Sequence, residues 1–265
     1  KTIDASYKAV KDFFALPLET KRKYGKIEGG QRGYNAFGVE HAKDSDKPDL
    51  KEFWHTGREL PVDHRFNKYY PSNVWPTEIP EFKPLLLSLY NELDKTANYI
   101  LEAIGKALDV PEGYFREMNT YGNSILRSIY YPAMKEAPPV GSVRAAAHED
   151  INLITILMGA TASGLELLDR DGSWLPVETK EGQLIVDSGD MLSRLTNNVI
   201  PATTHRVVNP TDFSQERFSM PFFVHPHPET TLACIPSCVG NGAKFPPINS
   251  HDFLHQRLRE IGLMK

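Results

Sequence analysis

The sequence is poor in cysteine, and it lacks both a long apolar run and an excess of one charge. Its two cysteines, Cys234 and Cys238, cannot build a disulfide framework, so we expect a reducing, cytoplasmic environment. No apolar stretch approaches the roughly 18 to 20 residues of a membrane span, and no signal peptide is recognisable. A formal net charge of -4 gives no basic field for nucleic acid or an anionic membrane, so we expect neither as a partner.

The composition is that of an ordinary globular protein, with 40% hydrophobic and 24% charged residues in a chain of 265. We predict a single domain over residues 1–265. It would comprise a mostly helical and loop-rich part (1–120), a β core (121–226) and a tail with a helix (227–265). The first residues have the pattern of a helix already under way, so we expect the true N-terminus to lie upstream. No obligate protein partner is evident.

Apolar residues at helical spacing predict helices in the first part of the chain. Residues 4–24 carry such a pattern, interrupted by a break at Leu16-Pro17-Leu18. Residues 25–80 indicate long loops with a few short strands. The clearest helix spans residues 84 to about 108, with an apolar residue every three or four positions and Pro84 in its first turn. We expect its apolar face to pack against a sheet.

After residue 120 the pattern changes to short runs of β-branched and aromatic residues, separated by turn-forming clusters. No helix-length segment interrupts them before a closing helix predicted over residues 251–262. This arrangement is typical of an antiparallel sandwich, barrel or jelly roll, so the predicted fold class is mainly β with flanking helices. The predicted strands are 125–131, 153–158, 164–168, 183–187, 204–208 and 218–224.

The segment His148-Glu149-Asp150 is the first candidate for chemistry. If it lies in a strand, His148 and Asp150 project from one face while Glu149 points away. An imidazole nitrogen and a carboxylate oxygen on one face supply half of a metal site. Taken alone, the segment occurs often by chance, and two surface residues on a strand are the simpler interpretation.

His205, in a second plausible strand, can complete a ligand set. Two histidines and one carboxylate with open positions are typical of non-haem iron(II) oxygenases, whereas structural zinc sites favour four ligands that include cysteines. Arg217-Phe218-Ser219 follows, and its first and third residues offer a guanidinium and a hydroxyl to a carboxylate from one strand face. A lone Arg217 would instead indicate a salt bridge at the rim. Together and in this order, the three ligands and the Arg-x-Ser pair predict an iron oxygenase.

The surrounding motifs resemble isopenicillin N synthase and its relatives, the iron(II)- and 2-oxoglutarate-dependent dioxygenases. The similar stretches are HEDINLITIL at 148–157, LTNN at 195–198, HRV at 205–207 and RFSMPFF at 217–223. Tyr130-Tyr131-Pro132 is similar to the Tyr-Tyr-Pro of plant flavonoid and hormone dioxygenases in the same superfamily. The resemblance runs from about residue 14 to about residue 226. It implies a double-stranded β-helix (jelly-roll) core with iron at its open end.

Carried over by position, the resemblance also implies roles for individual residues. His148, Asp150 and His205 would ligate iron(II). Arg217 and Ser219 would hold the distal carboxylate of 2-oxoglutarate. Tyr131 would add a hydroxyl donor to that carboxylate. The implied reaction uses O2 to hydroxylate or desaturate a small-molecule substrate, and it releases succinate and carbon dioxide.

Two departures from the family pattern qualify this interpretation. Ile129 stands where plant enzymes have asparagine, so one polar contact to the co-substrate is missing. Gln31 precedes Arg32-Gly33-Tyr34, where the synthase has an arginine that binds its tripeptide, so penicillin-type cyclisation is in doubt. The alternatives are a synthase-type iron oxidase without 2-oxoglutarate and a metal-binding jelly roll without turnover. Arg217 and Ser219 do not distinguish a 2-oxoglutarate-dependent enzyme from the synthase-type oxidase, because the synthase uses the same pair to bind its own substrate.

Other histidines and arginines carry weaker signals. The histidines after the Arg-x-Ser strand are predicted to be structural or solvated at the barrel rim: His225 and His227. One of the histidines in the loop-rich part could line a substrate pocket: His41, His55 or His64. Three arginines are candidates for a substrate carboxylate, with a surface or salt-bridge role at least as good an interpretation: Arg32, Arg127 and Arg144.

Overall fold

The computed structural model describes residues 1–25, 31–40, 48–136, 138, 141–178, 180 and 182–260. The helices are α1 (Thr2–Phe14), α2 (Leu18–Arg22), η2 (Arg65–Lys68), α3 (Phe82–Ala107), α4 (Tyr114–Asn119), α5 (Asp190–Leu195), η3 (Pro236–Cys238) and α6 (Ser250–Glu260). The strands are β1 (Gly33–Asn35), β2 (Glu52–Gly57), β3 (Ile125–Tyr131), β4 (Ala145–His148), β5 (Ile154–Met158), β6 (Leu165–Leu168), β7 (Trp174–Pro176), β8 (Leu184–Ser188), β9 (His205–Val207), β10 (Arg217–Ser219), β11 (Pro221–Val224), β12 (Thr231–Leu232) and β13 (Ile248–Asn249).

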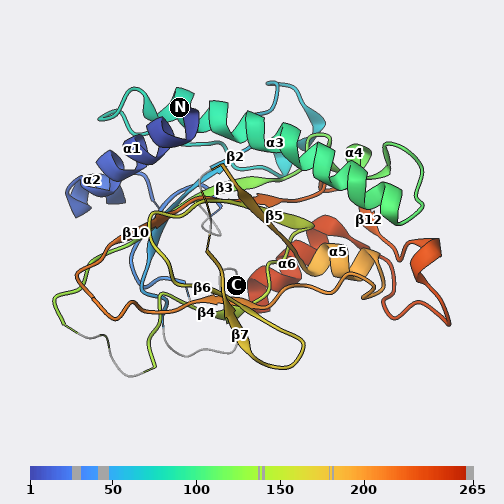
Figure 1. The fold of residues 1–265 in the computed structure, drawn as a ribbon. Helices are drawn as coiled ribbons and strands as arrows, with labels where there is room; N and C mark the ends of the chain where they lie inside the picture. The colour runs from blue at the N-terminus through green and yellow to red at the C-terminus, as the bar shows by residue number, and fades with distance from the viewer. Residues whose placement is uncertain are drawn as a thin grey trace.

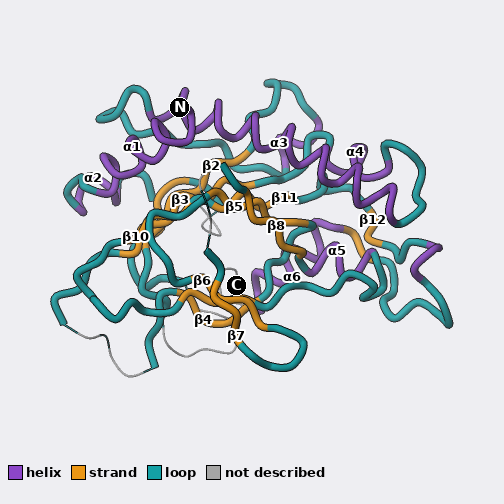
Figure 2. Tube along the Cα trace, viewed as in Figure 1, coloured by secondary structure: helices purple, strands orange, loops and turns teal. Residues whose placement is uncertain are grey.

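The strands form two main sheets that face each other. One has seven strands, in the order β1-β2-β3-β11-β5-β8 with β10 also pairing with β3. The other has four, in the order β4-β9-β6-β7, and β12 and β13 form a separate small ribbon. Helices α1 and α3 lie along the outer side of the seven-stranded sheet, and the strands of the smaller sheet lie on its other side (Figure 1, Figure 2). The predicted mainly β class with flanking helices is confirmed.

The apolar spacing of α3 explains why it covers the sheet. Leu86, Leu89 and Leu93 recur every three or four residues and are buried, so one helix face is removed from water. They belong to a large apolar cluster with Phe13 of α1 and Leu126 of β3. The predicted break before α2 is also confirmed, because α1 ends before Pro17.

A second, smaller core lies between the two sheets. Side chains alternate along β3, so Leu126 faces the helices while Ile129 and Tyr131 point to the opposite face. There they pack with Ala145 of β4 and Val207 of β9, on the smaller sheet. This alternation places the inner faces of β3 and β10 opposite the strands that carry the two candidate histidine ligands.

Three expectations about individual elements need correction. A short helix, α5, interrupts the predicted run of strands, and β4 and β7 were not predicted. Asp150 lies two residues beyond the end of β4 rather than within a strand.

Within the described ranges, no helix is both long and apolar enough to span a bilayer.

Candidate metal centre

The three predicted ligands converge at one end of the smaller sheet. His148 is the last residue of β4 and lies directly opposite His205, the first residue of β9. The Oδ1 atom of Asp150 is 3.8 Å from Nε2 of His148 and 3.9 Å from Nε2 of His205. All three ligand atoms lie within 4.8 Å of one another, close enough to share one ion.

The chain brings Asp150 back to the histidines through a turn rather than through strand alternation. The turn packs tightly against Gly189, the residue just before α5. This close contact leaves no room for a side chain at position 189. A Cβ atom on Gly189 would lie 2.4 Å from the carbonyl oxygen of Asn152 and 2.7 Å from that of Asp150. The amide of Asp190 donates to the Asp150 carbonyl at 2.8 Å and fixes the turn to α5.

Backbone carbonyls orient both histidine rings. Nδ1 of His148 lies 2.7 Å from the carbonyl oxygen of Ala146, and Nδ1 of His205 lies 3.1 Å from that of Thr203. Each Nδ1–H therefore donates to a carbonyl, which leaves the Nε2 lone pair for a metal. This is the usual outer support of histidine ligands, and it fits an ion held between the two Nε2 atoms.

The carboxylate of Asp150 is held from the larger sheet. Thr155 of β5 donates a short hydrogen bond to its Oδ2 atom. The Thr155 hydroxyl also accepts from Nδ2 of Asn152 at 2.9 Å, so its proton is committed to Asp150. With Oδ2 occupied in this way, Oδ1 is the oxygen that faces the histidines.

Electrostatics keep His148 and Asp150 in their metal-binding protonation states. Burial, followed by repulsion from His205, lowers the pKa of His148 to about 4. Burial opposes ionisation of Asp150, but the two histidines and the Thr155 hydroxyl outweigh it and lower the pKa of its carboxyl. A neutral imidazole and an ionised carboxylate at neutral pH are the forms that bind metal.

Asp187 on β8 is a neighbour of the site that the sequence did not single out. It lies opposite Thr155 in the β5–β8 ladder. Burial and the charge of Asp150 raise its pKa to about 7. Burial opposes protonation of His205, but Asp150 and then Asp187 outweigh it and raise the pKa of that histidine. The sequence predicted a strand that contains Asp187. It did not connect this strand to the site, because its pairing with β5 is not visible in the sequence.

The predicted co-substrate residues lie on the inner face of β10 and β3. Arg217 is paired with Tyr131 in the ladder, and Ser219 with Ile129. Arg217 is only 2% exposed, and its Nε atom donates to the carbonyl of Ala162 at 3.1 Å. Its Nη1 atom is buried and has no hydrogen-bond partner among the residues that the structure describes. The rim salt bridge considered for this arginine is therefore wrong, and a buried donor faces the space between the sheets.

A buried network of charges supports the strand that carries His148. Lys51 lies 2.6 Å from Glu40 and 2.9 Å from Asp49, and Asp49 accepts from the amide of Ala146 at 3.0 Å. Arg127 pairs with both oxygens of Glu40, so its predicted salt-bridge role is confirmed. The sequence analysis did not identify Glu40, Asp49 or Lys51, since nothing local marks them as partners.

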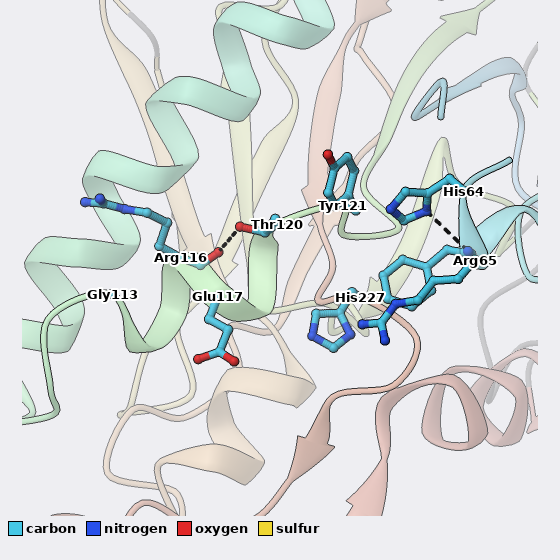
Figure 3. A pocket seen from close by; sticks show the side chains of 9 residues that line it. His64, Arg65, Gly113, Arg116, Glu117, Thr120, Tyr121 and His227 are labelled. Carbon is cyan, nitrogen blue, oxygen red and sulfur yellow. Dashed lines mark hydrogen bonds between the residues drawn. The ribbon is translucent and has the colours of Figure 1, made fainter. Parts of the chain in front are cut away.

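The remaining histidines lie apart from the ligand set. His55 is buried and accepts from Nε of Arg127 at 2.6 Å, while His41 lies outside the described residues. His225 is buried, with its Nδ1 atom 3.3 Å from the carbonyl of Phe223. His64 and His227 line a separate surface hollow of about 550 Å³ that contains none of the ligand residues (Figure 3).

Comparisons with known proteins bear on this geometry. The chain matches the 2OG-Fe(II) oxygenase superfamily over residues 122–226, and the N-terminal part described as non-haem dioxygenase in morphine synthesis over residues 1–78. It is 32% identical over 261 residues to the 2-oxoglutarate-Fe(II) type oxidoreductase hxnY of Emericella nidulans, covering 93% of this chain and 73% of the relative.

Two solved structures are similar over nearly the whole chain. A putative 2OG-Fe(II) oxygenase family protein from Caulobacter crescentus is 48% identical, with a TM-score of 0.89, covering 98% of this chain and 86% of that chain. A full-length Neurospora crassa protein, solved in complex with alpha-KG, is 29% identical, with a TM-score of 0.85, covering 97% of this chain and 82% of that chain. These neighbours confirm the predicted jelly-roll core.

Proposed function

Because this chain belongs to the 2OG-Fe(II) oxygenase superfamily and is an iron(II)- and 2-oxoglutarate-dependent dioxygenase, we propose that His148, Asp150 and His205 hold its iron. The observation that carries this assignment is the convergence of the three ligand atoms within 4.8 Å. The iron supplies the oxidising chemistry, in which O2 is reduced, 2-oxoglutarate leaves as succinate and carbon dioxide, and a small molecule is hydroxylated or desaturated. The three protein ligands leave positions open for the co-substrate and O2.

We assign the distal carboxylate of 2-oxoglutarate to Arg217 and Ser219. The unpartnered Nη1 donor of Arg217 supports this, since a buried guanidinium gains most from an anionic acceptor. Ser219, two residues on along the same strand face, adds a hydroxyl, and Tyr131 lies opposite Arg217 in the ladder. The apolar side chains around them, Ile129 among them, exclude water and so strengthen these polar contacts.

The experiment is succinate release from protein supplied with iron(II), ascorbate, O2 and labelled 2-oxoglutarate. We expect succinate from the wild type, and a loss of at least about 100-fold in His148→Ala and Arg217→Ala, because the first removes a metal ligand and the second removes a charged partner of the distal carboxylate. Arg206→Ala is the matched control, since this arginine pairs with Glu166 on the partly exposed side of β9. Succinate formation at the wild-type rate in His148→Ala would refute the ligand assignment.

A second candidate is the synthase-type oxidase, which the buried Arg217 also suits because the same donors can bind a substrate carboxylate. Wild-type protein that neither consumes nor binds 2-oxoglutarate would favour it. A titration of the metal-loaded protein with 2-oxoglutarate separates the two cases.

A further inference from the structure

A second buried arginine lies beside Arg217 in the space between the sheets. Arg144 stands just before β4 and is 1% exposed. The Cζ atom of Arg144 is 5.7 Å from the centre of the Tyr131 ring, and that of Arg217 is 5.0 Å from the same centre. The two guanidinium groups therefore converge on one tyrosine side chain.

Neither guanidinium has a negative partner among the residues that the structure describes. Arg144 donates a short hydrogen bond to the carbonyl of Gln215, and Arg217 donates to the carbonyl of Ala162, both of which are neutral acceptors. Nε of Arg144 and Nη1 of Arg217 are buried, and neither has a hydrogen-bond partner in the described part of the chain. Burial and the proximity of Arg217 both lower the pKa of Arg144, which is the expected response of two like charges taken out of water.

Two positive charges buried together are costly unless an anion compensates them. Two other cations, the buried Lys51 and the part-buried Arg127, show the contrast. Lys51 is neutralised by Glu40 and Asp49, and Arg127 by Glu40. The Arg144–Arg217 pair has two spare donors and no counter-charge within the described part of the chain, so the pair is suited to an anionic ligand.

We propose that Arg144 is a second binding residue for the distal carboxylate of 2-oxoglutarate, acting beside Arg217. This inference rests on the proposed function. The carboxylate would accept from both guanidinium groups over the Tyr131 ring, while the 2-oxo acid end binds at the metal. Such a pocket selects 2-oxo acids with a second, distal carboxylate and rejects 2-oxo monoacids, which would leave both charges unpaired.

The test compares two ligands that differ only at the distal end. 2-Oxoglutarate and 2-oxopentanoate have the same chain length, but the second has a methyl group in place of the distal carboxylate. Each is titrated calorimetrically into Mn(II)-loaded wild type, Arg144→Gln, Arg144→Lys, Arg217→Gln and Arg206→Gln. Thermal unfolding of every variant checks that it is folded.

We expect Arg144→Gln to weaken 2-oxoglutarate binding by about 10- to 100-fold and to leave 2-oxopentanoate binding unchanged, because only the charged end is lost. Arg144→Lys keeps the charge without the fork, so the loss should be smaller. Arg206→Gln should match the wild type. If Arg144→Gln unfolds, the lysine variant decides, since it should still reduce the preference for 2-oxoglutarate over 2-oxopentanoate.

Two results would overturn the inference. In the first, Arg144→Gln and Arg144→Lys bind 2-oxoglutarate as tightly as the wild type, while Arg217→Gln binds it more weakly. This result would leave the proposed function intact. The other is an equal loss for both ligands, which would make Arg144 a structural support of the Gln215 loop. Wild-type protein that binds no 2-oxoglutarate would instead refute the proposed function, and this inference with it.

Discussion

Thr155 connects the seven-stranded sheet to the proposed metal ligand Asp150 through a single hydroxyl group. Its proton is directed to Asp150 because its oxygen already accepts from Asn152. Replacing Thr155 by valine keeps the shape of the side chain and removes this donor. We expect Mn(II) affinity to fall about 10-fold, as is usual when the outer partner of a ligand is lost.

The measurement is a Mn(II) titration of Thr155→Val against Thr120→Val. Thr120 is exposed and donates to the carbonyl of Arg116 at the end of α4, so its replacement should leave Mn(II) affinity unchanged. Equal affinity in Thr155→Val and the wild type would show that the hydroxyl does not support the ligand.

His225 makes the stability of the folded protein depend on pH. Burial lowers its pKa to about 4 in the folded state, whereas an unfolded chain would protonate it near its ordinary value of 6.5. Its contribution to stability is therefore complete above pH 6.5 and is lost as pH falls towards 4, because only the unfolded chain takes up the proton. The loss between pH 7 and pH 5 should be about 2 kcal/mol.

Between pH 7 and pH 5, we expect the free energy of unfolding of His225→Asn to fall by about 2 kcal/mol less than that of the wild type. The check is urea unfolding of the metal-free proteins at pH 7, 6 and 5, in which the difference between the two proteins removes the titration of all other groups. Parallel pH profiles would contradict a depressed pKa for His225.

At the scale of elements, α3 is the helix that closes the outer face of the larger sheet. Leu86 is fully buried in the cluster between them, while Tyr99 on the same helix is 79% exposed. Leu86→Ala should lower the free energy of unfolding by about 2 to 5 kcal/mol through lost contacts and a cavity. Tyr99→Ala should change it by less than about 0.5 kcal/mol, and urea unfolding of both compares them directly. A Leu86→Ala variant as stable as Tyr99→Ala would mean that this face does not hold α3 to the sheet.

The helices and several strands were predictable because their patterns are local. The spacing of leucines from Leu86 onward predicted α3 within two residues at its start, and the run of β-branched and aromatic residues predicted β3 with its observed bounds. Strand β4 was missed because Ala145–His148 contains three alanines and has no strand-like composition. It is a strand only because β9, far along the chain, pairs with it.

The same distinction applies to the site. The convergence of His148, Asp150 and His205 was predictable because a family motif contains them. The reason given for Asp150 was wrong, since a turn against Gly189 and not a strand places it. Asp187 and the partners of Lys51 were not predictable. Their roles arise from contacts between elements that are distant in sequence, and a single sequence carries no record of such pairings.

At the scale of the whole molecule, the proposed metal site has ligands held by both sheets. His148 and His205 belong to the smaller sheet, while Asp150 is tied to the larger one through Thr155. An ion that binds only this folded arrangement must stabilise it, by about 2.7 kcal/mol when its concentration is 100 times its dissociation constant. For a chain of this size we expect Mn(II) to raise the melting temperature by about 5 to 10 °C. A chelator should reverse the shift, and His205→Ala should show none, because two remaining ligands hold the ion weakly. An equal rise in melting temperature in His205→Ala would place the stabilising ion elsewhere on the molecule. Metal binding would then not hold the two sheets together.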